Sequence, residues 1–289
     1  MTDRTVGEAM RAAARRLRDC GIADADLEAD VLMRHALNLG ADRAHLLSML
    51  QDPLPADAAA NFDALVQRRL GREPTAYIVG HREFYDLDLE CGPGALIPRP
   101  ETELLVDIAL EWLGGLHPPL ERPLIVDVGT GNGALAVALA VHVPGARVVA
   151  VDTSRAALAV ARRNARRHGV ADRVAPVYSD LLAPLGGKAH LIVANLPYVS
   201  AADWEGLAPE ITRYEPKEAL VGGAKGTETI ERLLVQAPAA MATRGLLLCE
   251  IGDRQGEALR AAAVRAFPDA WIEIRQDLAG LDRILYVEP

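Results

Sequence analysis

The strongest constraint on the fold is the alternation of apolar runs and amphipathic segments that fills the chain from residue 124 onward. Seven runs have the length and apolarity of buried strands, at residues 124–128, 147–151, 174–178, 190–194, 245–250, 271–275 and 283–288. Helical periodicity lies between them, at residues 133–142, 154–168, 227–242 and 254–266. Strands that alternate with helices form mainly parallel sheets covered on both faces. The sequence therefore predicts an α/β domain with a mostly parallel, Rossmann-like sheet, and a short loop at Ala279-Gly280 predicts that the last two strands pair antiparallel.

The chain before this alternation has a helical pattern and predicts a small N-terminal bundle. Thr5 and Glu8 have the spacing of a capping box, and Gly71 suits the end of a last helix. We expect helices at residues 5–20, 25–39, 42–50 and 56–70, and another at residues 101–113. Two short runs, residues 77–80 and 84–89, predict strands of a β-hairpin linker. The expected domains are a helical domain at residues 1–73, the linker at residues 74–97 and the α/β domain at residues 98–289.

Composition limits the class of protein. A net charge of −9 argues against sequence-independent nucleic-acid binding, which needs a cationic surface. No apolar run approaches the roughly 18 residues of a membrane span, and residues 1–4 lack the start of a secretory signal. The three cysteines are far apart and have no metal-ligand spacing. We therefore expect a cytoplasmic protein that binds no metal, no membrane and no nucleic acid directly. We also expect a monomer, although composition does not bear on oligomeric state.

A glycine-rich turn after the first strand of the α/β domain indicates a cofactor site. Gly129, Gly131 and Gly133 separate a strand from the helix that follows, where the backbone must bend and helix N–H groups are unpaired. Asp152 ends the next strand, where a carboxylate can accept both hydroxyls of a ribose. The pattern Gly129-x-Gly131-x-x-Ala134 also fits a dinucleotide fingerprint, so the glycines alone do not identify the cofactor.

Three features favour S-adenosylmethionine over a nicotinamide cofactor. The turn is denser in glycine than the dinucleotide fingerprint requires. Asp127 precedes it, where a carboxylate suits a cationic amino group better than a pyrophosphate. Asp180 follows the third strand and could reach an adenine N6. A nicotinamide cofactor stays the alternative, because helix N-termini of this type also bind phosphates.

The tetrapeptide Asn195-Leu196-Pro197-Tyr198 follows the apolar run at residues 190–194 and indicates the acceptor site. Ligands of open α/β sheets bind at the carboxyl ends of the strands. The side-chain oxygen of Asn195 and the carbonyl of Leu196 could accept the two N–H bonds of a planar amide or amine. Pro197 restricts the backbone, and Tyr198 could stack on the planar group. These four residues are therefore the predicted substrate-binding and catalytic residues of a methyl transfer to nitrogen.

With these motifs the chain resembles the release-factor glutamine N5-methyltransferases over almost its whole length. The most specific string is Pro98-Arg99-Pro100-Glu101-Thr102-Glu103. The other matching stretches are Arg72-Glu73-Pro74, residues 77–80, Phe84, Leu96-Ile97, residues 127–133, Asn195-x-Pro197-Tyr198, Pro209-Glu210, Glu215-Pro216, residues 219–223, Glu250-Ile251-Gly252 and residues 277–283.

The resemblance implies a fold, an activity and a set of residues. The family has an N-terminal helical domain, a hairpin linker and a seven-stranded class I S-adenosylmethionine-dependent methyltransferase domain. It methylates the side-chain amide of the glutamine in the Gly-Gly-Gln loop of peptide chain release factors, with S-adenosylhomocysteine as product, and the helical domain would help to dock the release factor. The family's donor-binding residues map to Gly129, Thr130, Gly131, Asn132, Gly133, Asp152, Leu181 and Asn195, and its asparagine-proline-proline-tyrosine element maps to residues 195–198.

Two departures from the family pattern leave other functions to weigh. Leu196 stands where the family usually has proline, and Lys225-Gly226 stands where it tends to have aspartate-glycine. Asn-Leu-Pro-Tyr also resembles the element of ribosomal-RNA adenine dimethyltransferases, so a nucleic-acid adenine N6-methyltransferase is the alternative enzyme. The third class is a non-catalytic docking protein that retains the fold, against which the intact glycines, Asp152 and Asn195 argue.

Overall fold

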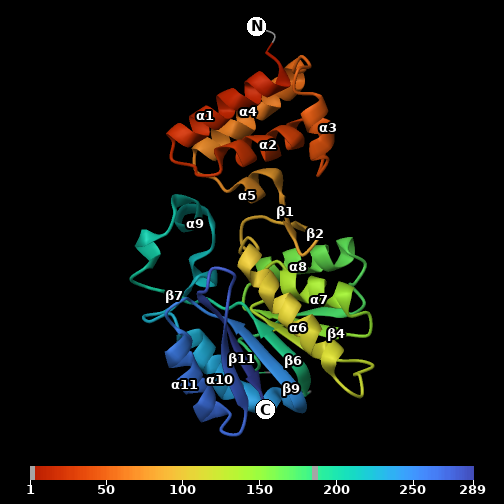
Figure 1. Cartoon of the computed structure of the whole chain (residues 1–289), viewed down its shortest axis with the longest axis vertical. Coiled ribbons are helices and arrows are strands. Elements are labelled where there is room, and N and C mark those ends of the chain that lie inside the picture. The colour runs from red at the N-terminus through yellow and green to blue at the C-terminus, as the bar shows by residue number, and fades with distance from the viewer. Residues whose placement is uncertain (1–3, 184–187) are drawn as a thin grey trace. The chain divides into compact units, whose positions relative to one another are not determined.

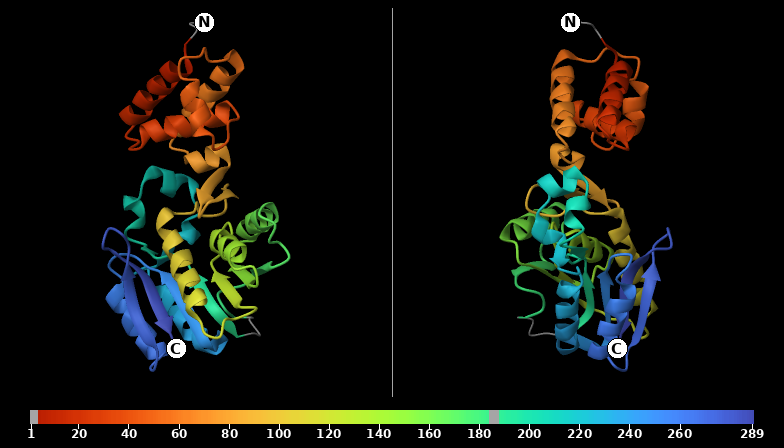
Figure 2. Two further views of the ribbon diagram at one scale, coloured as in Figure 1. Left: turned by 45° about the vertical axis from the view of Figure 1, so that its right-hand side comes forward. Right: turned by 90° about the vertical axis from the view of Figure 1, so that its left-hand side faces the viewer.

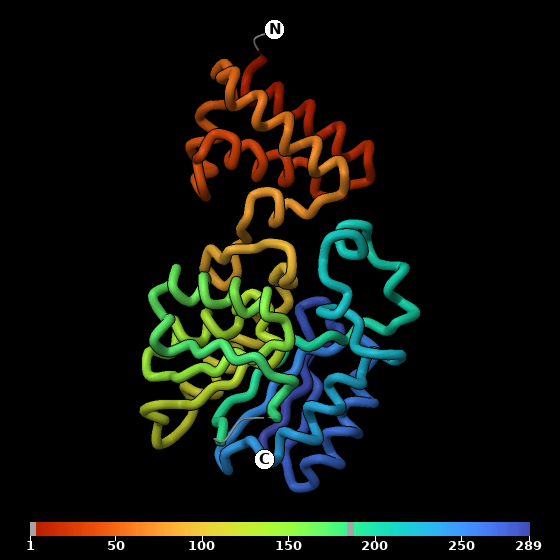
Figure 3. Tube along the Cα trace, turned by 180° about the vertical axis from the view of Figure 1, so that it is seen from behind, coloured from red at the N-terminus to blue at the C-terminus, as the bar shows by residue number. Residues whose placement is uncertain are grey.

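The chain forms two structural units. A computed structural model describes residues 4–183 and 188–289 (Figure 1). One unit contains the chain up to Gly80 together with Pro209–Tyr214, and the other contains His81–Ala208 and Glu215–Pro289. The segment predicted as a linker, residues 74–97, is thus shared between them. Figure 3 traces the path of the backbone through each unit, from red at the N-terminus to blue at the C-terminus.

The first unit is the helical bundle that the sequence predicts. Its helices are α1 (Val6–Asp19), α2 (Ala25–Ala36), α3 (Arg43–Ser48), α4 (Ala56–Leu70) and the short α5 (Thr75–Val79). The capping box at the start of α1 is confirmed, since Thr5 Oγ1 accepts from the Glu8 N–H and the Glu8 carboxylate accepts from the Thr5 N–H. The buried side chains of Leu32, Met33 and Phe62 form the centre of this core.

One short helix from far along the chain completes this unit. Helix α9 (Pro209–Tyr214) carries Glu210, whose carboxylate accepts from Arg69 at 3.0 Å and from Arg72 at 2.8 Å. The Tyr214 hydroxyl donates to the carbonyl of Gly71 at 2.9 Å. These contacts hold residues 209–214 against the end of α4, which the sequence did not predict.

The strand predicted at residues 77–80 is wrong, because this run forms helix α5. Pro74 precedes the helix, Gly80 ends it in the left-handed region with φ +84°, and Ile78 and Val79 pack into the helical core. Burial in that core outweighs the strand preference of a short β-branched run. The run at residues 84–89 is not one strand either. The hairpin pairs β1 (His81–Phe84) with β2 (Leu87–Glu90) around Tyr85 and Asp86, both at positive φ.

The second unit contains the predicted seven-stranded sheet. Its strands are β3 (Leu124–Val128), β4 (Arg147–Asp152), β5 (Val174–Tyr178), β6 (Ala189–Ala194), β9 (Met241–Glu250), β10 (Trp271–Gln276) and β11 (Asp282–Glu288). Their order across the sheet is β10-β11-β9-β6-β3-β4-β5. The pairs from β9 to β5 are parallel, whereas β11 is antiparallel to both β9 and β10. The predicted α/β, Rossmann-like methyltransferase fold and its antiparallel last pair are confirmed.

Helices cover the two faces of this sheet, as Figure 2 shows in two further views. One face packs against α6 (Glu103–Gly115), α7 (Ala134–His142) and α8 (Arg155–Arg167), and the other against α10 (Glu228–Ala240) and α11 (Gly256–Ala266). Successive residues of a strand point to opposite faces. Accordingly Ile125 belongs to the first hydrophobic cluster and Val126 to the second. Both faces are therefore buried, which explains why the strand runs are almost continuously apolar.

Several short elements surround the carboxyl edge of the sheet. They are η1 (Pro100–Thr102), β7 (Val199–Ser200), η2 (Trp204–Gly206), η3 (Lys217–Ala219) and β8 (Val221–Gly223). Glu215, shortly before η3, is bonded to the residues that precede η1, since its carboxylate accepts from the Ile97 N–H at 3.1 Å and from Arg99 at 2.5 Å. None of the described helices is both long and apolar enough to cross a membrane.

Candidate active site

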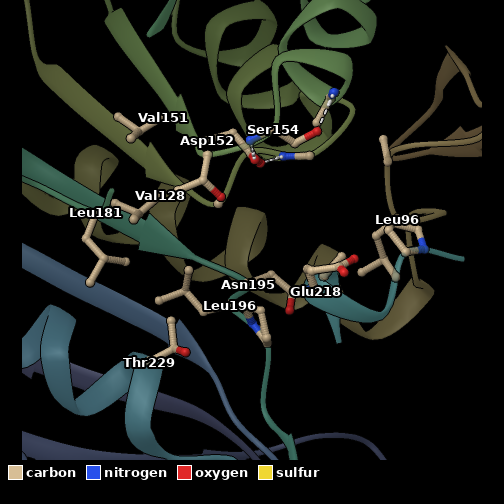
Figure 4. Close-up of a pocket in the computed structure, with 18 of the residues that line it drawn as sticks. Leu96, Val128, Val151, Asp152, Ser154, Leu181, Asn195, Leu196, Glu218 and Thr229 are labelled. Carbon is tan, nitrogen blue, oxygen red and sulfur yellow. Dashed lines mark hydrogen bonds between the residues drawn. The ribbon is translucent and has the colours of Figure 1, made fainter. Parts of the chain in front are cut away.

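A pocket of about 690 Å³ lies at the carboxyl ends of the central strands (Figure 4). It opens beside β3, whose neighbours β4 and β6 continue the chain on opposite sides of it. This is the topological switch point at which doubly wound sheets bind ligands, and the volume is that of an ordinary small-molecule site. Of the predicted site residues, the lining includes Gly129, Gly131, Asp152, Asp180, Leu181, Asn195, Leu196 and Pro197.

The glycine-rich turn is held against the end of β4. The N–H groups of Gly129 and Thr130 both donate to the carbonyl of Val151, at 2.8 and 2.9 Å. Gly129 has φ +74°, and a Cβ on it would lie 2.9 Å from Leu196 Cδ2. Only glycine fits there without strain, because the backbone is left-handed and the neighbouring side chain is in contact. The turn therefore keeps its backbone at the pocket wall.

Asp152 is the carboxylate at the end of β4, and it is fixed by two backbone donors. Its Oδ2 accepts from the Gly131 N–H at 2.9 Å and its Oδ1 from the Ser154 N–H at 2.7 Å. Burial raises the pKa of Asp152, while these hydrogen bonds oppose the rise. Figure 4 shows Asp152 beside Ser154 at one side of the pocket. Such a carboxylate keeps further lone pairs for the hydroxyl groups of a ligand.

Asp127 does not line the pocket, although its position before the turn favoured a contact with a cationic amino group. Its carboxyl is 1% exposed and turned inward, where Oδ2 accepts from Thr130 Oγ1 at 2.6 Å and from the Ala136 N–H at 3.1 Å. Oδ1 has no hydrogen-bond partner within the described ranges. Burial raises the pKa of Asp127 to about 7. The role that the structure gives Asp127 is to hold the turn from behind.

The charges around the pocket favour a cationic ligand. Carboxylates of Asp152, Asp180 and Glu218 are part of the lining. Arg232 is the one lysine or arginine among the described lining residues, and it is paired with Asp180 at 2.5 Å. An acidic pocket of this kind suits the sulfonium and ammonium groups of S-adenosylmethionine and opposes a pyrophosphate. The residues present therefore fit that donor better than a dinucleotide.

Asn195 follows β6 and lines the pocket with Leu196 and Pro197. The Asn195 side-chain amide donates from Nδ2 to Thr102 Oγ1 at 2.9 Å. This bond leaves Oδ1 as an acceptor that does not face Thr102. The side chain of Leu196 is 4% exposed and packs at the Gly129 turn, so the two ligand-binding segments touch there.

Tyr198 and three residues of the glycine-rich segment are not part of the pocket lining. The Tyr198 hydroxyl donates to Glu250 Oε1 at 3.0 Å, and its carbonyl accepts from Gln255 at 2.8 Å. Thr130 bonds to Asp127, and the Asn132 side chain accepts from the Ala134 N–H. Gly133 precedes α7 with Ala161 against it. Tyr198, Thr130 and Asn132 thus have hydrogen bonds within the chain, and the ligand contacts that the sequence predicts for all four residues stay predictions.

Two parts of the chain match described protein families. Residues 8–80 match the PrmC N-terminal domain, and residues 106–213 match the methyltransferase small domain. The release factor glutamine methyltransferase of Moorella thermoacetica is 42% identical over 282 residues, which cover 96% of each chain. The enzyme of that name from Cereibacter sphaeroides is 40% identical over 96% of each chain, and that of Bacillus anthracis is 32% identical over 90% of this chain and 91% of its own.

The chain belongs to the release factor glutamine methyltransferase family. Solved structures share the α/β fold described above. The hMettl16 catalytic domain in complex with a MAT2A 3′UTR hairpin is 15% identical with a TM-score of 0.55, over 81% of each chain. A methyltransferase from Pyrococcus furiosus is 17% identical with a TM-score of 0.50, over 79% of this chain and 98% of its own. At these identities the likeness is one of fold alone.

In this member of the release factor glutamine methyltransferase family, sequence reasoning missed three residues that contact the predicted site residues. Thr102 and Glu250 bond to the predicted residues Asn195 and Tyr198, and Arg232 pairs with Asp180. Thr102 and Glu250 lie in strings that carried the family resemblance, but no spacing in the sequence connects them with residue 195. Arg232 lies on α10 with no motif around it. The family strings were the only indication in the sequence that Thr102 and Glu250 matter, and their contacts are known only from the fold.

Proposed function

We propose that this methyltransferase transfers a methyl group from S-adenosylmethionine to the side-chain amide nitrogen, N5, of the glutamine in the Gly-Gly-Gln loop of peptide chain release factors. The observation that carries the proposal is the Asn195 amide at the pocket wall, with its NH₂ group committed to Thr102 and its oxygen left to accept. Membership of the release factor glutamine methyltransferase family supports the choice of substrate.

On the donor side, named residues suit each part of the cofactor. S-adenosylmethionine supplies an activated methyl group on a sulfonium and leaves as S-adenosylhomocysteine. Asp152 would accept from the ribose hydroxyls, and Asp180 and Leu181 would lie at the adenine. The backbone of Gly129, Thr130, Gly131, Asn132 and Gly133 would form the wall against the rest of the donor. The acidic lining supports this assignment, because it favours a cationic donor.

On the acceptor side, the chain would orient a poorly nucleophilic nitrogen. Asn195 Oδ1 accepts one N–H of the glutamine amide, the Leu196 carbonyl accepts the other, and the nitrogen is thereby aimed at the methyl group. Pro197 limits the freedom of the segment that holds these acceptors, and Tyr198 would pack against the planar amide. Two acceptors also favour the positive charge that develops on the nitrogen. Methylation leaves the nitrogen positively charged and strongly acidic, so its extra proton passes to water after the transfer and no strong base is required.

The helical unit would contribute the docking surface for the release factor. A release factor is a protein, so neither a cationic surface nor direct contact with nucleic acid is needed, in agreement with the net charge of −9. We expect the enzyme to act as a cytoplasmic monomer.

Transfer of a radioactive methyl group tests the proposal. The protein is incubated with labelled S-adenosylmethionine and either a purified release factor or ribosomal RNA, and the labelled residue is located by mass spectrometry. We expect label on the Gly-Gly-Gln glutamine and none on RNA. Replacement of that glutamine by alanine in the release factor should abolish labelling. Label on adenine N6 would support the alternative enzyme, and absence of label from both substrates would indicate a docking protein.

A further inference from the structure

A buried chain of hydrogen bonds connects Asn195 with Glu250. Asn195 Nδ2 donates to Thr102 Oγ1 at 2.9 Å, and Thr102 Oγ1 donates to Glu250 Oε2 at 2.6 Å. The other carboxylate oxygen, Oε1, accepts from the Tyr198 hydroxyl at 3.0 Å. Glu250 is 1% exposed and Thr102 is 4% exposed. Water therefore does not compete for these bonds, and both oxygens of the carboxylate are engaged.

When Glu250 is ionised, the donors and acceptors of these hydrogen bonds can be arranged in only one way. A threonine hydroxyl has a single proton, and a carboxylate can only accept, so the Thr102 proton goes to Glu250. Thr102 Oγ1 can then only accept from Asn195, which places the NH₂ group of that side chain toward Thr102. The two orientations of an asparagine amide are otherwise similar in shape. The carboxylate at residue 250 thus determines which way the Asn195 amide is turned.

We propose that Glu250 is a positioning residue for methyl transfer, which through Thr102 holds the Asn195 oxygen toward the substrate amide and directly holds the hydroxyl of Tyr198. This inference rests on the proposed function for the identity of the substrate. Both side chains that the acceptor site uses are fixed by one buried carboxylate, which itself does not contact the substrate.

The groups that face Glu250 determine how this device responds to pH. Burial raises the pKa of Glu250, the hydroxyls of Thr102 and Tyr198 and the charge of Arg283 lower it, and Glu101 raises it. Arg283, from β11, is itself held by Asp277 at 3.0 and 3.1 Å. A protonated Glu250 could donate to Thr102, whose own proton would then go to Asn195 Oδ1 and occupy the acceptor. Transfer should therefore decline as the pH falls through the raised pKa of Glu250.

Threonine variants test the chain of bonds. Thr102→Val keeps the volume but removes the hydroxyl, whereas Thr102→Ser keeps it. We expect Thr102→Val to lower kcat for release-factor methylation roughly 10- to 100-fold, the loss typical of a misplaced reacting group, with donor Kd within about twofold. Thr102→Ser should recover most of this loss. Equal loss in both variants, or loss of donor affinity by the same factor as kcat, would mean that Thr102 only packs the site.

A glutamine at residue 250 tests the carboxylate. Glu250→Gln offers one acceptor oxygen instead of two, so the hydroxyl of either Thr102 or Tyr198 loses its acceptor, and kcat should fall by about tenfold or more. The acid decline of kcat that we expect for the wild type should be absent from this variant. Glu257→Gln, the same change at an exposed position on α11, should leave both kcat and the pH profile unchanged. A wild-type pH profile in Glu250→Gln would overturn the proposal.

A measurement without turnover separates this inference from the proposed function. In the ligand-free protein labelled with ¹⁵N, the side-chain amide protons of Asn195 should exchange slowly with solvent in the wild type and in Thr102→Ser. They should exchange at least roughly tenfold faster in Thr102→Val, because a bond to a buried acceptor is lost. If the wild type methylates no release factor but this difference appears, the proposed substrate is wrong and the positioning role stands. Equal exchange in all three proteins would refute the positioning role whatever the substrate.

Discussion

The two sides of the pocket are built in different ways. On the donor side, backbone N–H groups hold the glycine turn and Asp152 together among residues close in the sequence; the Gly131 N–H, for example, donates to the Asp152 carboxylate 21 positions later. On the acceptor side, Asn195 bonds to Thr102, 93 positions earlier, and Thr102 bonds to Glu250, 148 positions later. The donor side is therefore a local structure, whereas the acceptor side exists only after the whole sheet has formed.

Each side nevertheless relies on a buried carboxyl group that accepts a hydrogen bond from a threonine hydroxyl at 2.6 Å. Asp127 accepts from the hydroxyl of Thr130, and Glu250 accepts from that of Thr102. Asp127 holds a backbone turn, while Glu250 holds side chains that would act on the substrate. Substitutions should therefore separate the two sides, with donor-side changes acting on affinity or stability and acceptor-side changes on turnover.

The largest effect is expected from Asn195→Ala. Removal of one of the two oxygen acceptors should lower kcat about 100- to 1,000-fold, as loss of a group that stabilises developing charge does elsewhere. The donor should still bind with affinity near the wild-type value, since Asp152 and the glycine turn are unchanged. Isothermal titration with S-adenosylhomocysteine beside a methylation assay measures both quantities. Loss of donor affinity equal to the loss of kcat would show that Asn195 serves mainly the donor.

The opposite pattern is expected from Asp152→Ala. Without the charged acceptor for the ribose hydroxyls, and with the Gly131 and Ser154 N–H groups unpaired, donor affinity should fall roughly 10- to 100-fold. At saturating donor, kcat should stay within about threefold of the wild type, because the acceptor side is intact. Asp152→Asn retains one acceptor oxygen and should lose less affinity. Unchanged donor affinity in Asp152→Ala would show that Asp152 does not bind the ribose hydroxyls.

The same difference explains what could be predicted from the sequence. The sheet strands and the glycine turn were predicted closely because both leave local patterns, apolar runs and glycines between a strand and a helix. Asp127 was assigned to the donor because sequence position does not reveal that a side chain points inward at a strand's end. Its neighbour in the fold, the Ala136 N–H, lies in the helix after the turn.

Segments fixed by distant partners could not be predicted. Residues 77–80 have strand-forming side chains, yet burial against the helical core makes them α5. Helix α9 is too short for periodicity to indicate it, and Glu210 is held by Arg69 and Arg72, 141 and 138 positions earlier. Thr102 and Glu250 likewise depend on partners that are distant in the sequence. Side chains whose roles depend on tertiary pairing leave no signal in spacing, whatever their importance to the site.

The contact between the two sides can itself be tested, at Gly129. Gly129→Ala forces an alanine to φ +74° and brings its Cβ to 2.9 Å from Leu196 Cδ2. The free energy of unfolding should fall by about 1–3 kcal/mol, the usual penalty for a strained backbone position. Gly131→Ala is the matched control, because Gly131 also has positive φ, at +55°, but a Cβ there meets no described atom within 4 Å. The difference between the two variants in urea unfolding isolates the steric contact. Equal losses would mean that the two segments do not press on each other.

Asp127→Asn sharpens the comparison of the two buried carboxyls. The raised pKa of Asp127, about 7, means that its neutral form is the stable one in the fold. A carboxyl group whose pKa is raised by folding stabilises the fold fully at pH values below its unfolded pKa, near 4. This stabilisation is lost as the pH rises through the folded pKa of about 7. Wild-type stability should therefore decline relative to Asp127→Asn by about 1 kcal/mol per pH unit between about pH 5 and pH 7. Urea unfolding at several pH values measures this, and parallel curves for the two proteins would contradict it.

The smallest effect is expected from Leu196→Pro, which introduces the residue usual in the family. The proposed chemistry uses only the carbonyl of residue 196, and proline keeps that carbonyl while stiffening the segment. Loss of leucine packing at Gly129 opposes the gain in rigidity, so stability should change by less than about 1 kcal/mol and kcat by less than about twofold. Asn195→Ala changes the preceding residue and gives the contrast in the same assay, since its kcat should fall by about two to three orders of magnitude. Because proline fixes φ, an inactive Leu196→Pro would mean that the backbone at residue 196 adopts a conformation proline cannot, and hence that the carbonyl on which the acceptor side depends points elsewhere.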